Sequence, residues 1–362
     1  MKFGLLFTFQ LPPGCGISWS EPYQDMLRCL PRAEELGYRS MYLATHHAKT
    51  DGLCPGPLPT LGAAAAVTKT MKIGTAVMLV PMYAPLKLAE DIAVLDNISE
   101  GRFILGVAPG YVAEEFAAHG IPREERVGRF EEALDLMIAA WTQDDFEFNG
   151  KYYRVPRTVM TPKPVQKPYP QIWYGVSAKS SLKRAARRHA IQIMSPRHGI
   201  AELQAHYAPY EAAAQEIGWT IPERPIIRQV FVASTLQKAE ALAAPAIEHL
   251  YREVYGKASA AGDRVLRNDD GSPITDHHQV NFDTFKARYI VGTPEFAINE
   301  IIKYRDGLGC TEMVCWMHMP GIRGADVMTS VELFAQEVMP VFQTEPLNDA
   351  CHSLSQRGSH TR

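Results

Sequence analysis

The fold is indicated first by two short apolar runs, FGLLFTF at residues 3–9 and YRSMYLA at residues 38–44. Between them, residues 21–36 carry apolar side chains at helical spacing, and Gly37 follows as a helix stop. Apolar runs of this length, joined by an amphipathic helix, are typical of a βαβ unit with buried parallel strands.

The same alternation continues along most of the chain. Six more apolar runs predict strands at residues 73–80, 103–108, 172–176, 191–194, 226–233 and 312–316. Helical patterns lie between and after them, near residues 58–68, 86–98, 123–141, from about 178, and near 200–217, 236–255, 294–306 and 325–340. Eight alternations of strand and helix predict an α/β protein, a single (β/α)8 TIM barrel.

Two segments interrupt this pattern. Residues 146–170 alternate aromatic and polar residues and then carry five prolines, which predicts a small hairpin and an extended connector. Residues 256–290 are polar and contain glycine, and an insertion of that length is usually functional or disordered. We expect one barrel domain over residues 1–342 and a polar, disordered C-terminal tail over residues 343–362.

Composition is that of an ordinary globular protein. Of the 362 residues, 46% are hydrophobic and 21% charged, and the net charge of −3 indicates neither a nucleic-acid nor a membrane partner. The six cysteines include no C-x-x-C pair and predict neither a zinc site nor a disulfide framework. Residues 3–9 follow the first methionine without a basic segment or a cleavage site, so a cytoplasmic protein is expected.

Two histidines follow the second predicted strand. In a (β/α)8 barrel the site lies at the C-terminal ends of the strands, which is where His46 and His47 fall. Adjacent residues at a strand end point to opposite sides, so at most one of them faces the barrel mouth. A loop histidine that only satisfies local backbone groups is the alternative. No further ligands at metal-binding spacing accompany the pair, and no metal site is predicted.

The segment after the fifth predicted strand contains Ser177 and Ser180 where a helix begins. Backbone N–H groups of a helix N-terminus together with two hydroxyls form a pocket suited to a phosphate. Simple helix capping by Ser177 is the alternative. Trp316 and the methionines at the strand ends are by default core residues, although a flat aromatic ligand would need such a wall.

Several short motifs then occur in a fixed order. They are Met1–Gly4 with Gln10–Pro13, His46–His47, Ile73–Val77, Pro85 with Ala89–Asp91, Leu95–Asp96, Ser99–Phe103, Val291–Glu295, and Phe334 with Val338–Pro340. The ordered set, which spans roughly residues 1–342, resembles the bacterial luciferase-like flavin-dependent monooxygenases.

The resemblance implies a luciferase-type barrel that receives reduced FMN from a separate flavin reductase. It also implies reaction with O2 to a flavin (hydro)peroxide, which transfers one oxygen atom to an organic substrate. By position His46 resembles the family's active-site histidine, and Ser177 and Ser180 resemble the hydroxyls that hold the FMN phosphate. Ala76 and Val77 match a non-prolyl cis peptide beside the flavin ring.

The chain departs from the luciferase pattern at four positions near the expected cofactor. Thr45 and Val176 stand where the luciferase has acidic residues. Ala108 and Pro109 replace a reactive cysteine and a phosphate-binding arginine. Light emission is therefore not expected, and the phosphate must find positive charge elsewhere, with Arg184 and Arg197 as candidates. Residues 256–290 fall where the luciferase has a mobile active-site loop, which predicts a water-excluding lid or else an idle insert.

We therefore predict an FMN-dependent, reductase-fed monooxygenase that acts on a small or medium apolar organic molecule and forms a homodimer. A barrel that uses a deazaflavin for hydride transfer without oxygen is one alternative. A non-catalytic flavin-binding subunit is the other.

Overall fold

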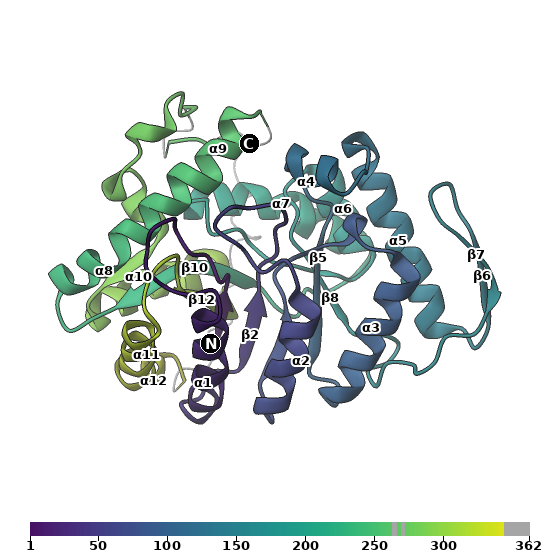
Figure 1. Cartoon of the computed structure of the whole chain (residues 1–362), viewed down its shortest axis with the longest axis horizontal. Coiled ribbons are helices and arrows are strands. Elements are labelled where there is room, and N and C mark those ends of the chain that lie inside the picture. The colour runs from purple at the N-terminus through teal and green to yellow at the C-terminus, as the bar shows by residue number, and fades with distance from the viewer. Residues whose placement is uncertain (263–265, 269–271, 344–362) are drawn as a thin grey trace, which may run out of the picture.

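The computed structural model describes residues 1–262, 266–268 and 272–343. In these residues eight parallel strands form a curled sheet surrounded by helices (Figure 1). The eight are β1 (Lys2–Phe7), β2 (Ser40–Leu43), β3 (Lys72–Thr75), β5 (Phe103–Ala108), β8 (Gln171–Tyr174), β9 (Ile191–Gln192), β10 (Pro225–Val232) and β12 (Glu312–His318). A parallel bridge between Met194, just after β9, and Ile226 of β10 joins the two sides and closes the barrel. The predicted (β/α)8 barrel is confirmed.

The helices that cover the barrel follow the predicted alternation. They are α1 (Glu21–Glu35), α2 (Pro57–Val67), α3 (Pro85–Ile98), α5 (Arg126–Thr142), α6 (Lys179–Arg187), α7 (Ile200–Glu216), α8 (Leu236–His249), α10 (Pro294–Leu308), α11 (Gly324–Leu333) and α12 (Met339–Gln343). A π-helical segment, Phe334–Val338, joins α11 to α12 within the helix predicted near residues 325–340.

Some short elements were not predicted, and one predicted strand is divided in two. The predicted strand 73–80 is divided into β3 and β4 (Met78–Leu79), and β11 (Ile290–Gly292) adds to the C-terminal half of β10. A short helix, α4 (Ala113–Ala118), follows β5. Each is too short to produce a recognisable periodicity in sequence.

The first interruption has the predicted form. Residues 146–170 contain the antiparallel hairpin of β6 (Phe146–Asn149) and β7 (Arg154–Thr158), which projects from the barrel beside α5 (Figure 1). The extended connector that follows contains two cis prolyl peptides, at Pro162 and Pro168.

The second interruption is partly helical. After α8 the chain continues as a π-helical segment, Leu250–Gly256, and as α9 (Lys257–Ala260), so residues 256–260 extend the preceding helix rather than open a loop. Residues 263–265 and 269–271 of the predicted lid lie outside the described residues, and so does the predicted tail from residue 344. The predicted domain limits at residues 342 and 343 remain a prediction.

A close approach of β3 and β5 sets the geometry next to the site. The Thr75 hydroxyl donates to the Gly106 carbonyl at 2.7 Å and accepts from the Gly106 N–H at 3.0 Å. A Cβ at Gly106 would lie 1.8 Å from the Thr75 carbonyl oxygen, so no larger residue fits there without moving backbone. This contact fixes the strand ends at Ala76 and Ala108 relative to each other.

Candidate active site

A cavity of about 420 Å³ opens at the face where the barrel strands end, as the barrel rule predicts. Its size falls within the range of small-molecule sites. Residues from the ends of five strands contribute to its wall: His46, Ala108, Ser177, Arg197 and Trp316. Segments that are far apart in sequence therefore meet around one space.

His46 lines the cavity and His47 does not. The Nδ1 of His46 lies 2.6 Å from Oε1 of Glu115, and the same oxygen accepts the backbone N–H of His47 at 3.1 Å. The His47 ring instead packs edge-on against Tyr83 and His119, with centroids 6.2 and 4.8 Å away. The expectation that at most one histidine faces the mouth is confirmed.

Glu115 is a site residue that the sequence reading missed. It lies on α4, its side chain is 0% exposed, and its second oxygen has no hydrogen-bond partner in the described residues. Burial alone would raise the pKa of Glu115, but the hydrogen bond and charge of His46 and the N–H of His47 lower it. The sequence does contain a signal for a buried Glu115, because Val112, Glu115 and Phe116 stand at the spacing of one helical face.

The predicted flavin-ring residues lie together in the wall. Ala76 and Val77 are joined by a cis peptide bond, as expected, and both line the cavity beside Ala108. Gly175 faces the Val77 side chain so closely that a Cβ there would lie 2.7 Å from a Val77 methyl. Ala108, which stands where the luciferase has a cysteine, presents a small apolar side chain to the cavity.

The two predicted phosphate-binding serines differ in position. Ser177 and the preceding Val176 line the cavity, whereas Ser180 is exposed and is not part of the cavity wall. Ser181 is buried and lines the cavity in its place. Ala178, not Ser177, is the N-cap of α6, and no side chain caps this helix. Simple capping by Ser177 is therefore not what the structure contains.

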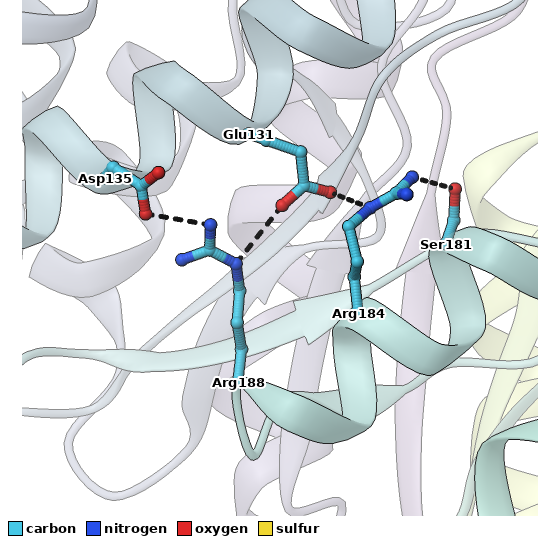
Figure 2. A network of polar contacts seen from close by, with 5 residues as sticks. All are labelled: Glu131, Asp135, Ser181, Arg184 and Arg188. Atoms are coloured by element: carbon cyan, nitrogen blue, oxygen red, sulfur yellow. Dashed lines mark hydrogen bonds and ion pairs between the residues drawn. The ribbon is translucent and has the colours of Figure 1, made fainter. Parts of the chain in front are cut away.

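An ion-pair network joins α5 to α6 (Figure 2). Glu131 accepts from Nε of Arg184 at 2.8 Å and from Nε of Arg188 at 3.2 Å, and Arg188 also reaches Asp135 at 2.8 Å. Arg184 donates to the Ser181 hydroxyl at 2.9 Å. The charge of Arg184 is thus balanced by Glu131, and Arg184 does not line the cavity. Its role is to hold Ser181 and the first turn of α6 against α5.

Two other arginines, Arg126 and Arg197, do line the cavity. Arg126 is the first residue of α5, and its Nη1 donates to the carbonyl of Arg123 at 3.0 Å. Since α5 and α6 both start at the mouth of the barrel, the network places Arg126 and Ser181 in the first turns of two neighbouring, parallel helices. Arg126 is a source of positive charge that the sequence reading did not single out.

Comparison with known proteins gives the family. Residues 1–311 match the family model described as luciferase-like monooxygenase. The chain belongs to this family. The predicted family is therefore confirmed, as is the prediction of an enzyme, a flavin-dependent monooxygenase.

One relative in sequence and two solved structures match nearly the whole chain. The oxygenase component of a flavin-dependent trigonelline monooxygenase from Acinetobacter baylyi is 25% identical over 88% of this chain and 90% of its own. The oxygenating constituent of 3,6-diketocamphane monooxygenase from Pseudomonas putida, solved with FMN, has a TM-score of 0.79 at 24% identity, covering 94% of this chain and 98% of its own. A coenzyme F420-dependent tetrahydromethanopterin reductase from Methanopyrus kandleri has a TM-score of 0.69 at 19% identity, covering 94% and 99%.

Two other kinds of site are not found within the described residues. Within residues 1–262, 266–268 and 272–343, no helix combines the length and apolar character needed to cross a bilayer. In the same residues no group of three or more histidine, cysteine, aspartate or glutamate side chains is arranged to hold a metal ion.

The buried Glu115 leads to a prediction on stability and pH. Because its pKa is lower in the folded chain than in the unfolded one, its contribution is complete above the unfolded pKa and is lost as pH falls through the folded pKa. We expect Glu115→Gln to reduce the free energy of unfolding at pH 7 by about 1.5–3 kcal/mol. The difference from wild type should shrink as the pH falls below 4.5, the ordinary glutamate value.

Urea denaturation of both proteins between pH 3.5 and 8 measures this difference. Glu114→Gln is the matched control, since Glu114 is the exposed neighbour on the same helix, and it should stay close to wild type at every pH. A stability difference for Glu115→Gln that does not change with pH would contradict an ionised Glu115 beside His46.

Proposed function

We propose that this luciferase-like protein uses reduced FMN and O2 to oxygenate a small or medium organic substrate. One oxygen atom would enter the product and the other would leave as water. The observation that carries the proposal is one cavity whose wall contains cationic and hydroxyl groups, small apolar residues and His46. Reduced FMN would supply the electrons for oxygen activation.

The residues present fit the two chemical parts of FMN. Arg126, Ser177, Ser181 and the uncapped N-terminus of α6 offer positive charge and hydrogen-bond donors for a phosphate. Ala76, Val77 and Ala108 offer an apolar surface for the ring. Arg126 supplies the charge that Pro109 cannot, so the departure from the luciferase pattern does not prevent phosphate binding. Of the two arginines considered from sequence, Arg184 is held by Glu131 instead.

His46 is suited to move a proton at the mouth of the cavity. Its Nδ1 is engaged by the Glu115 carboxylate, so Nε2 is the nitrogen available to substrate. A carboxylate on the opposite ring nitrogen fixes the tautomer and stabilises the imidazolium when it forms. We propose that Nε2 of His46 acts as the general acid or base of the reaction.

The relatives support the cofactor and the partner. The 3,6-diketocamphane enzyme was solved with FMN, and the trigonelline enzyme is described as an oxygenase component. By analogy we propose reduced FMN as cofactor and a separate flavin reductase as its donor. The route through a flavin (hydro)peroxide and the homodimer, both expected from the family resemblance, and the cytoplasmic location stay predictions.

Hydride transfer with a deazaflavin is the second candidate, because the F420-dependent reductase shares the fold. A non-catalytic flavin-binding subunit is less well supported, since such a subunit would not need a histidine held at the mouth by a buried carboxylate. The two catalytic alternatives differ in which reduced cofactor binds and whether it reacts with oxygen.

The proposed function is tested by mixing the chain with reduced FMN, and separately with a reduced deazaflavin, before adding O2. We expect micromolar or tighter binding of reduced FMN, and a delayed return of oxidised-flavin absorbance relative to free FMN in stopped flow. Tight binding of the deazaflavin without any reaction with O2 would favour the second candidate instead. Failure of both cofactors to bind would contradict both candidate functions.

The phosphate site gives a prediction with an internal control. Ser177→Ala with Ser181→Ala should weaken FMN binding by about 10-fold or more for each charge-assisted hydrogen bond lost. Binding of riboflavin, which has no phosphate, should hardly change. Ser180→Ala is the control for the exposed neighbour and should leave both affinities unchanged. An equal loss for FMN and riboflavin in the double variant, measured by fluorescence titration, would mean that the phosphate binds elsewhere.

The histidine pair gives a kinetic prediction. His46→Ala should bind reduced FMN nearly normally but turn over about 10²- to 10⁴-fold more slowly, because the proton-transfer group is lost. His47→Ala should keep more of its activity, since the His47 ring lies outside the cavity. Activity is measured from pH 6 to 9 with thermal unfolding as a check on the fold. A reversed order of the two variants, or full activity of His46→Ala across this pH range, would contradict the role of His46.

A further inference from the structure

Arg197 is a buried arginine in the cavity wall with no acidic partner in the described part of the chain. It follows β9, its side chain belongs to a residue that is only 6% exposed, and its guanidinium carbon lies 5.1 Å from the ring centroid of Tyr255. Tyr255 also lines the cavity. An aromatic face offsets only part of the cost of burying a charge, so an anion at this position would be stabilised.

The segment that carries Arg197 is held by two further arginines. Arg228 is fully buried and donates to the carbonyls of Ser195 at 3.0 Å and His198 at 2.9 Å. Arg288 donates from Nη1 to the carbonyl of Arg197 at 2.8 Å. The backbone on both sides of Arg197 is thus fixed by the protein, which is the arrangement expected of a preorganised binding group.

The cavity wall contains basic side chains but no acidic ones in the part of the chain that the structure describes. Among the residues that line the cavity in the described structure there are two arginines, three histidines and no aspartate or glutamate. Behind the wall, Arg228 also forms no ion pair with a described carboxylate, and its Nε has no hydrogen-bond partner there. His198 lies 3.4 Å from Glu202, but Glu202 does not line the cavity.

The FMN phosphate is not the anion that this position fits best. Arg126 and the serines follow the fourth and fifth barrel strands, β5 and β8. Arg197 follows the sixth strand, β9, and its guanidinium lies against Tyr255 of the π-helical segment after α8. The cavity therefore has a second cationic position, whose partner Tyr255 lies on the same π-helical segment as the apolar lining residues Leu250 and Val254.

We propose that Arg197 binds the carboxylate of the substrate, so that the substrate class is organic acids rather than purely apolar molecules. One guanidinium carries one positive charge, and its parallel N–H donors match the two oxygens of a carboxylate. The inference rests on the proposed function only for what happens to the acid after it binds. The apolar lining residues of the Tyr255 segment suit an acid with a hydrophobic body.

The experiment measures binding of matched probes by calorimetry, with the full chain both free and saturated with oxidised FMN. The probes are benzoate against benzamide and hexanoate against hexanamide, which differ in charge but hardly in size. We expect wild type to bind at least one acid about 10- to 100-fold more tightly than its amide. Arg197→Gln should abolish this preference, and Arg197→Lys should restore part of it.

Arg224→Gln is the matched control. Arg224 also lies over a tyrosine ring, 4.8 Å from the centroid of Tyr207, but it is paired with Glu211 and is not part of the cavity wall. This variant should keep the full preference for the acid. Thermal unfolding of each variant shows whether a lost preference reflects a lost fold, and Arg197→Lys remains informative if Arg197→Gln does not fold.

Three results would overturn the proposal: no preference for either acid in wild type, a preference that survives in Arg197→Gln, or a loss of FMN affinity without loss of riboflavin affinity in that variant. The last would make Arg197 a phosphate ligand. Because the probes are bound without turnover, a failure of oxygenation with reduced FMN would refute the proposed function and leave the acid site standing. Absence of acid binding with intact oxygenation would refute the acid site and leave the proposed function standing.

Discussion

Because the barrel strands run parallel, every segment that follows the C-terminal end of a strand lies at the same face of the molecule. The bridge between Met194 and Ile226 makes this face a closed ring instead of an open edge. Residues as distant in sequence as His46 and Trp316 therefore line one cavity. The site depends on this constraint more than on any single contact, since its lining residues come from segments after several different strands.

The distribution of charge around that ring follows from where carboxylates are placed. Glu131 and Asp135 lie on the outer helix α5 and neutralise Arg184 and Arg188, so these arginines act as a clamp between helices (Figure 2). Among the described residues, no carboxylate lines the cavity to neutralise Arg126 and Arg197. The same residue type thus stabilises the scaffold in one place and remains able to bind an anion in another.

Glu115 differs from the carboxylates of α5, because its partner His46 lines the cavity. It is a buried carboxylate beside the cavity, and it contacts His46 without lining the cavity itself. The low pKa that His46 and the His47 N–H give it keeps it ionised, so it can orient the imidazole. The carboxylate that contacts His46 therefore comes from the segment after the fourth barrel strand, two repeats further along the chain.

The sequence by itself determined the barrel, the order of its eight strands, and the position of His46, Ser177 and the Ala76–Val77 pair at the strand ends. Those features depend on local periodicity and on motifs, both of which are properties of contiguous residues. Only the tertiary structure decided that Ser181 rather than Ser180 faces the cavity, that Glu131 occupies Arg184, and that Glu115 meets His46. The first two depend on how one helix is rotated against another. The third is a contact between two residues that lie 69 positions apart in the sequence. A hydrophobic pattern defines which face of a helix is buried, but not which polar side chain at the edge of that face meets a partner from elsewhere in the chain.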